Sequence, residues 1–267
     1  TIGPQSRGPE TLKALNRAGM DIARLNGSHS DLDWHRDTIA LIREILPDVP
    51  VLLDLPGPKI RTQLRDEELV VAAGDNIVLS TNSGHNGNGI VSLTVTELHR
   101  EVTAGDRIVA DNGSLRLSVL EVDGRDIRCL AESGGVIRSG KGIHVPGLNF
   151  RYGFISERDR QLISLAAQCG VDFLGVSFVQ TEEQLKSVRD LLSDRSIRLV
   201  CKVETQGALD CLPELMDAAD ALMIDRGDLS LETNAERVAL HQKTEPSAAG
   251  LRRELCGEAH KQGFGAN

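Results

Sequence analysis

The sequence predicts an α/β protein in which a parallel barrel of strand–helix units is interrupted by an inserted antiparallel β domain. Three strand–helix units follow one another over residues 1–61, and charged or hydroxyl-bearing residues come after each strand. Residues 62–147 then show short alternating apolar runs divided by Gly-Asp, Asn-Gly and Asp-Gly turns, as in antiparallel hairpins. Helical periodicity returns afterwards, so we assign residues 148–267 to the second part of the barrel.

The composition is that of a globular protein with an acidic surface. The 267 residues suffice for one large domain with an insertion, and 40% are hydrophobic against 26% charged. A net charge of -9 and a pI near 5.3 argue against nonspecific binding to nucleic acids or anionic membranes. No apolar run is long enough to span a bilayer. The five cysteines are scattered without metal-type pairing, so we expect a reducing, cytoplasmic location.

The first part of the barrel consists of short elements in alternation. We expect a strand exit at 1–6, a helix closed by Gly19, a strand at 20–25, a helix at 32–46 and a buried strand at 50–54. Asp31 precedes the second helix as its N-cap. The chain begins at Thr1 rather than methionine, so we expect a leading segment to be missing.

The second part of the barrel should add three more units. We expect a helix from Ser156 to Cys169 stopped by Gly170, a strand at 171–177 and a helix begun by a Thr181–Gln184 capping box. A strand, a helix and a strand follow over 198–224, and an amphipathic helix covers 247–261. This makes six units. A six-stranded open barrel would expose sheet edges, so we expect that strands seven and eight are missing from the chain.

The stretch from Cys201 to Glu232 carries the strongest chemical signal. Lys202 and Glu204 are two residues apart at the end of one strand, so their side chains lie on one face of the sheet, and Asp228 follows the next strand. The carboxylates are ligands suited to Mg²⁺ or Mn²⁺, and the lysine can neutralise a developing enolate or phosphoryl charge. The alternative is a solvated surface pair followed by a polar loop.

Seven motifs resemble pyruvate kinase and occur in that family's order between Thr1 and about Lys243: TIGPQS, MDIARLNGSHS, LLDLPGPKIRT, GKGIHVPG, GVDFLGVSF, CKVETQGAL and ALMIDRGDLSLE. The resemblance implies a (β/α)8 TIM-type barrel whose β domain, inserted after strand three, closes as a lid over the active site. It also implies a glycolytic, ATP-binding transferase that moves phosphate from phosphoenolpyruvate to ADP, giving pyruvate and ATP, with Mg²⁺ or Mn²⁺ and usually K⁺. For the complete protein we expect a homo-oligomer.

The resemblance assigns a role to each matching residue. Lys202 and Arg24 correspond to the catalytic cations that bind substrate, and Glu204 and Asp228 to the metal ligands. The backbone at Gly227 and Asp228 corresponds to the site of the substrate carboxylate. The nucleotide side corresponds to Thr1, Pro4, His29, Arg61 and Lys141. Lys141 lies between two glycines, which allows close approach to a phosphate; the alternative is a simple hinge.

The family's monovalent-cation site departs from its usual pattern. Asn26, Ser28 and Asp54 match it, but Leu55 replaces a threonine that supplies a carbonyl. Lys59 stands where many members have glutamate, and an internal ammonium there would replace K⁺. We therefore predict an enzyme that does not require K⁺; the alternative is that this lysine is solvated.

Other departures keep alternatives open. The strand-seven threonine motif and the C-terminal effector domain of the family are absent, Gln180 replaces a common arginine and Gly27 an aromatic residue. Asp225 replaces an alanine that is usual in the family, and three interpretations are open: the aspartate changes the metal affinity, it indicates another substrate, or it faces solvent. Two other functions remain: a metal-dependent lyase or decarboxylase acting through a pyruvate enolate, which would not need Arg61 or Lys141, and a catalytically inactive regulatory relative.

Overall fold

The computed structural model describes residues 1–65, 68–85, 87, 89–110, 114–148, 153–225 and 228–229. The chain divides into two compact units, each described here by itself: Thr1–Gly57 with Ile155–Asn267, and Pro58–Phe154. Gly227, the expected helix at 247–261 and the rest of the chain after residue 229 lie outside the described residues.

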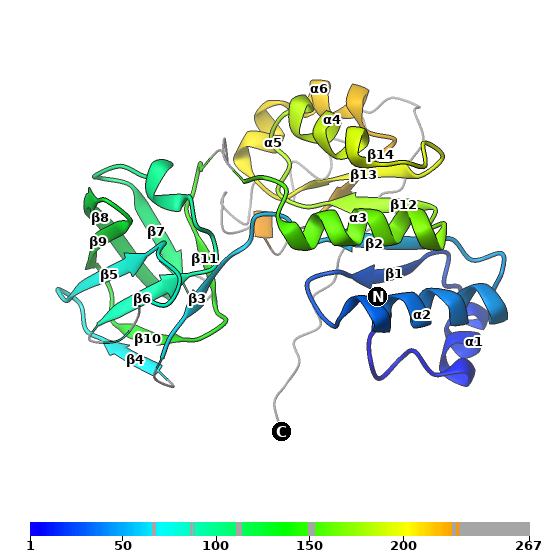
Figure 1. Ribbon diagram of the computed structural model, residues 1–267, viewed down its shortest axis with the longest axis horizontal. Helices are drawn as coiled ribbons and strands as arrows, with labels where there is room; N and C mark the ends of the chain where they lie inside the picture. The colour runs from blue at the N-terminus through cyan, green and yellow to red at the C-terminus, as the bar shows by residue number, and fades with distance from the viewer. Residues whose placement is uncertain are drawn as a thin grey trace. The chain divides into compact units, whose positions relative to one another are not determined.

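The first unit is built on a five-stranded parallel sheet (Figure 1). Its strands, in spatial order, are β1 (Ala23–Asn26), β2 (Val51–Leu55), β12 (Phe173–Val176), β13 (Arg198–Val203) and β14 (Ala221–Ile224). Every neighbouring pair is parallel. The N-terminal residues add only an isolated parallel bridge between Ile2 and Leu25, where the Ile2 amide donates to the Arg24 carbonyl at 2.7 Å. The parallel sheet expected from the strand–helix pattern is confirmed.

Helices cover the strands of this unit in chain order. They are α1 (Pro9–Arg17), α2 (Leu32–Ile45), α3 (Glu157–Cys169), α4 (Glu182–Leu191), α5 (Gln206–Asp210) and α6 (Leu212–Ala218). α3 packs against β2 and α4 against β13 (Figure 1). Contacts between helices join α1 with α2, α2 with α3, α3 with α4, and α6 with both α4 and α5. The expected caps are confirmed for α3, because Ser156 and Asp159 form a reciprocal capping box and Gly170 ends the helix at φ 60°.

The segment between β13 and β14 corrects one prediction. The sequence pattern indicated a single helix, whereas the chain forms α5 and then restarts as α6 after Cys211. Pro213 lies in the first turn of α6, where its missing N–H is tolerated, but it cannot donate the bond that would continue α5. The strand expected at 20–25 also begins later, at Ala23, and runs to Asn26.

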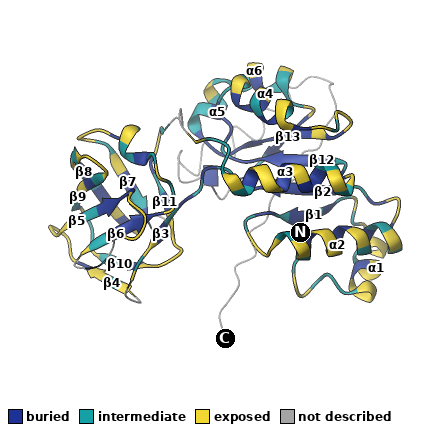
Figure 2. Cartoon of the chain, in the orientation of Figure 1, coloured by how far each residue is buried: buried dark blue, intermediate teal, exposed yellow. Residues whose placement is uncertain are grey.

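Strand register brings particular side chains to one face of this sheet. Leu52, Phe173, Val200, Ala221 and Met223 form a buried apolar cluster there, and Figure 2 shows the strands as the most buried part of the unit. Because side chains alternate along a strand, the residues two positions further on lie on the same face. On β2, β12 and β13 these are Asp54, Gly175 and Lys202, so two charged side chains, with a glycine on the strand between them, continue the face beyond the apolar cluster.

The second unit is a closed β barrel. Its strand order is β11 (Gly142–His144), β3 (Ile60–Gln63), β6 (Ile90–Leu93), β5 (Asn76–Ser80), β9 (Asp126–Ala131), β8 (Leu115–Asp123) and β7 (Arg107–Ala110). A 3₁₀ turn, η1 (Leu98–Arg100), precedes β7, and β4 (Glu68–Val71) pairs with β10 (Gly135–Arg138) as a separate two-stranded sheet. Strands β3 and β11, through which the chain enters and leaves the barrel, pair antiparallel.

The interior of the barrel is apolar because its strands alternate. Ile108 on β7, Leu117 on β8 and Ile127 on β9 are fully buried members of one continuous core. The Asp-Gly turn expected between β8 and β9 is confirmed, with Gly124 at φ 58°. The insertion was predicted to be antiparallel, and this is wrong for one pair of strands: β5 and β6 are parallel to each other. Within the described part of both units, no helix combines the length and apolarity needed to cross a bilayer.

Candidate active site

The carboxyl ends of β13 and β14 bring the predicted residues together. The register pairs Val203 with Ile224, so Glu204 and Asp225 leave the two strands next to each other. Glu204 Oε1 lies 2.6 Å from Lys202 Nζ, which confirms that both side chains of this strand end lie on one side. Lys202 is only 4% exposed, so the alternative of a solvated surface pair is wrong.

The Lys202 ammonium is surrounded by acceptors from three further strand ends. It lies 3.3 Å from Asp54 Oδ2 on β2 and 3.6 Å from Asp225 Oδ2 after β14. It also donates to Ser177 Oγ, which follows β12, at 3.0 Å. Burial alone would lower the pKa of Lys202, but Asp54, Glu204 and Asp225 outweigh it and raise that pKa, so the group stays charged.

Arg24, the second residue of β1, joins the same group. Its guanidinium forms an ion pair with Asp54 Oδ2 and donates to Thr1 Oγ1 at 2.9 Å. Burial opposes the charged form, but Asp54 prevails and raises the pKa of Arg24. One carboxylate oxygen therefore contacts both cations. We call the six residues the strand-end cluster: Arg24, Asp54, Lys202, Glu204, Asp225 and Asp228.

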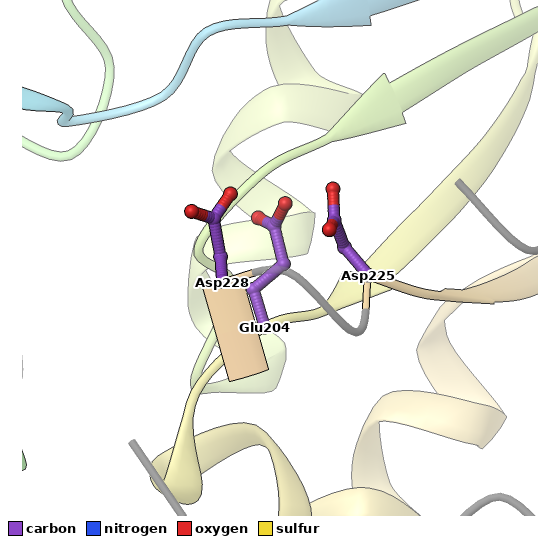
Figure 3. A group of neighbouring side chains, drawn as sticks. All are labelled: Glu204, Asp225 and Asp228. Carbon is purple, nitrogen blue, oxygen red and sulfur yellow. The ribbon is translucent and has the colours of Figure 1, made fainter. Parts of the chain in front are cut away.

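Three carboxylates of the strand-end cluster form a potential metal site. One oxygen each from Glu204, Asp225 and Asp228 lies within 4.8 Å of the others, and Figure 3 shows the carboxylates side by side and pointing the same way. Glu204 Oε2 accepts from the Phe178 amide at 2.7 Å, which fixes the side chain. Glu204 Oε1 is buried, receives no hydrogen bond of good geometry from the described residues, and contacts the Lys202 ammonium as an ion pair.

The charges of the cluster suit a divalent cation. Its four carboxylates and two cations leave a net charge of minus two when all are ionised. Burial, followed by the negative charges of Asp228 and Asp225, raises the pKa of Glu204 to about 7 against the opposing effect of Lys202. Hard carboxylate oxygens are the ligands that Mg²⁺ and Mn²⁺ prefer, so these residues fit the metal.

Asp225 and Ser177 go beyond what the sequence assigned. The sequence left three interpretations of Asp225 open, and the solvent-facing one is wrong because the residue is 4% exposed. Ser177 was expected only as the last residue of a strand. The signal for it was its spacing, since it lies two residues after Gly175 and therefore on the same face of β12.

Other residues assigned by the resemblance are distributed over both units. In the loop after β1, Asn26 Oδ1 accepts from the Ser28 amide at 3.0 Å, and the His29 carbonyl contacts His35 Nε2 at 2.9 Å. Pro4 lies in the first unit, as does Thr1 beside Arg24. The second unit contains Lys59, Arg61 and Lys141.

In the second unit, Arg61 and Lys141 are near each other. The Arg61 guanidinium donates to the Gly140 carbonyl at 2.9 Å, next to Lys141 in the chain. The nucleotide set is thus divided between the two units, and its assembly stays a prediction. Gly227, assigned to the substrate carboxylate, lies outside the described residues.

Comparisons with known proteins identify the family of the chain. The model of the pyruvate kinase barrel domain matches residues 1–248. Proteins named pyruvate kinase from Thermococcus litoralis and Clostridium perfringens are each 34% identical, over 250 and 252 residues, covering 91% of this chain and 53% of each relative. One from Bacillus licheniformis is 35% identical over 253 residues, with 91% and 43% covered. The chain spans about half the length of these relatives. With the family's motifs at the matching strand ends and most of its length covered by the family's barrel-domain model, the chain belongs to the pyruvate kinase family.

Proposed function

We propose that the chain carries a phosphotransferase site that converts phosphoenolpyruvate and ADP to pyruvate and ATP. The observation that carries the proposal is the strand-end cluster, in which the buried Lys202 ammonium contacts three carboxylates and shares Asp54 with Arg24. Phosphoryl transfer depends mainly on positioning and charge neutralisation, which converging cations and a metal site supply. We also infer that the five parallel strands belong to a (β/α)8 barrel, which family membership supports.

The two cations have separate roles in this proposal. Arg24 binds the phosphoryl group of the substrate, because a guanidinium offers several donors to phosphate oxygens. Lys202 neutralises the negative charge that develops between the transferring phosphoryl group and the enolate oxygen. Ser177 orients the ammonium through the bond at 3.0 Å. A buried site makes these charges more effective than they would be in water.

The acidic side of the cluster holds the divalent ion. Glu204 and Asp228 are the proposed ligands, and Asp225 is the third carboxylate within reach. A bound Mg²⁺ or Mn²⁺ supplies Lewis-acid polarisation and charge neutralisation at the substrate oxygens. The Phe178 amide holds Glu204 in the orientation that presents its other oxygen to the cluster.

The nucleotide and monovalent-cation sides rest on the resemblance. We propose that Thr1, Pro4, His29, Arg61 and Lys141 bind ADP, and that Lys59 replaces K⁺. The test of the latter is the rate of phosphotransfer in KCl, NaCl and a buffer without either salt. Equal rates are expected, and strong activation by K⁺ over Na⁺ would contradict the internal-cation proposal.

Compartment and assembly follow as smaller proposals. Cys129, Cys169, Cys201 and Cys211 are free thiols, which supports a reducing compartment such as the cytoplasm. The homo-oligomer stays a prediction that light scattering tests.

A coupled assay with phosphoenolpyruvate, ADP and Mg²⁺ tests the central proposal. Lys202→Met should lower kcat by roughly 10²–10³-fold, the usual effect of removing one preorganised charge-stabilising group. The matched control is Lys186→Met, because Lys186 is an exposed helix lysine paired with Glu182. Equal background rates in the wild type and Lys202→Met would refute the kinase assignment. Pyruvate formation that does not depend on ADP would indicate hydrolysis of phosphoenolpyruvate and would contradict phosphotransfer. The lyase or decarboxylase alternative requires a different substrate, one that releases a pyruvate enolate when a carbon–carbon bond is cleaved.

A further inference from the structure

Asp54 lies between two glycines at the ends of neighbouring strands. Gly27 follows β1, and Gly175 stands directly opposite Asp54 in the register of β12 with β2. A Cβ atom on Gly27 would lie 2.5 Å from the Asp54 carbonyl oxygen, and one on Gly175 would lie 2.2 Å from Asp54 Oδ1. Atoms do not approach this closely without a shift, so neither position has room for a side chain while Asp54 keeps its place.

The carboxylate that occupies this space links the two cations of the cluster. Its Oδ2 contacts both the Arg24 guanidinium and, at 3.3 Å, Lys202 Nζ. Two buried cations that converge on one point repel each other unless an anion lies between them. Asp54 supplies that anion, and its side chain is only 3% exposed.

The other oxygen of this carboxylate shows what holds Asp54 in place. Asp54 Oδ1 is buried and has no hydrogen-bond partner among the described residues. A buried polar atom without a partner is unfavourable, so the side chain is held by its two cations rather than by bonds to both oxygens. Oδ1 faces Gly175, the residue whose missing side chain leaves it space.

We infer that Gly175 is a positioning residue of the site: its missing side chain admits the Asp54 carboxylate, which holds Arg24 and Lys202 together on the substrate side of the sheet. This inference rests on the proposed function. A methyl group at position 175 collides with Oδ1, so the carboxylate leaves its rotamer and the two cations separate. Neither Gly175 nor Asp54 touches the substrate in this scheme.

A purely structural role for this glycine makes a different prediction. If Gly175 only permitted close strand packing, its replacement would lower stability whatever residue stood at position 54. If it acts through the carboxylate, its replacement matters only while Asp54 is present. Coupling between the two positions distinguishes the roles, because residues that act through one another show non-additive effects.

A double-mutant cycle provides the experiment. The kcat for phosphotransfer is measured for the wild-type chain, Gly175→Ala, Asp54→Ala and the double variant. Gly175→Ala alone should lower kcat by roughly 10²-fold, the scale expected for a misplacement of about 1 Å. In the Asp54→Ala background it should change kcat by less than about twofold, the accuracy with which independent effects add. Gly8→Ala is the matched control, because a Cβ on this glycine meets only the Thr11 hydroxyl oxygen at 3.8 Å, an ordinary van der Waals contact, and the residue lies outside the proposed site.

Two results would overturn the inference. One is an equal fold-loss from Gly175→Ala in both backgrounds, and the other is an unchanged kcat in Gly175→Ala. If the wild type transfers no phosphate, the proposed function fails. The inference is then tested by measuring the free energy of unfolding for the same four proteins. Gly175→Ala should lower this free energy less in the Asp54→Ala background than in the wild type, and an equal loss in both backgrounds would overturn the inference. Asp54→Ala leaves Arg24 and Lys202 without their shared anion, so its own stability is the baseline for the double variant.

Discussion

Replacing Lys202 by methionine should destabilise the metal-free protein strongly. Methionine keeps the length of the side chain but removes the ammonium that contacts Glu204 at 2.6 Å, Asp54 at 3.3 Å and Asp225 at 3.6 Å. Removing one partner from a buried ion pair typically costs about 3–5 kcal/mol, because the remaining charges stay buried without compensation. We expect a loss of this size in the free energy of unfolding.

A divalent cation should restore much of the loss. In the wild type the ammonium opposes a metal bound to Glu204, and in Lys202→Met this repulsion is absent. A ligand at 100 times its Kd stabilises the folded state by about 2.7 kcal/mol, and each tenfold gain in affinity adds about 1.4 kcal/mol at fixed concentration. Mg²⁺ should therefore stabilise the variant more than the wild type.

Urea unfolding in EDTA and in excess MgCl₂ measures both effects. Lys186→Met serves as the control, because Lys186 lies on the exposed face of α4 and its replacement should leave both measurements unchanged. Equal stability of Lys202→Met and the wild type in EDTA would refute the argument from buried charge. Equal stabilisation of both by Mg²⁺ would refute the argument that the ammonium and the metal compete for the same carboxylates.

Four further predictions concern metal binding and pH. Burial, together with the negative charges of Asp228 and Asp225, raises the pKa of Glu204 to about 7. Mn²⁺ affinity should therefore fall by up to about tenfold for each pH unit below 7, because the protonated carboxyl group cannot bind the metal. Calorimetry at pH 6 and pH 8 measures this, and the same Kd at both pH values would contradict it. For the metal-free protein the sign is opposite: this raised pKa contributes stability below the ordinary value of 4.5, and the contribution is lost as the pH rises through 7. Asp225→Ala should weaken Mn²⁺ binding by at least the roughly 10–100-fold that residues outside the ligand sphere contribute, and an unchanged Kd would exclude Asp225 from the site. Burial lowers the pKa of His35 below its ordinary value of 6.5, so the contribution of His35 to the free energy of unfolding should fall as the pH drops below 6.5, opposite in sign to that of Glu204. The difference between the wild type and His35→Gln in a urea-unfolding series isolates this contribution, and a difference that does not change with pH below 6.5 would contradict it.

Local signals predicted the first unit's elements well. Strands β13 and β14 match the expected bounds, because apolar runs ending in charged residues mark both. The caps of α3 follow from Ser156, Asp159 and Gly170, whose chemistry acts within one helical turn. The same signals missed the break between α5 and α6, where a proline and the packing of a short segment outweigh helical periodicity.

Relations between distant strands could not be predicted from spacing. The alternation of side chains along a strand places Lys202 and Glu204 on one side of β13. It does not predict that Asp54 Oδ2, on β2, contacts both Arg24 and Lys202. Whether Asp225 turned inward or toward solvent depended on the register of β13 with β14. Strand pairing over long separations is set by the packing of the whole sheet, so only the structure supplies these contacts.

The β barrel is held closed by hydrogen bonds between the segments through which the chain enters and leaves it. Where the chain enters at β3 and leaves at β11, the Thr62 amide donates to the Lys141 carbonyl at 2.9 Å, and the Gly140 amide donates to the Thr62 carbonyl at 2.7 Å. Among the described residues, these two hydrogen bonds join the entering strand of the unit to the segment that leads into its leaving strand. A domain whose entering and leaving strands pair with each other can be gained, exchanged or expressed separately during evolution or engineering. A short loop can then connect the two chain ends that it leaves in the other unit.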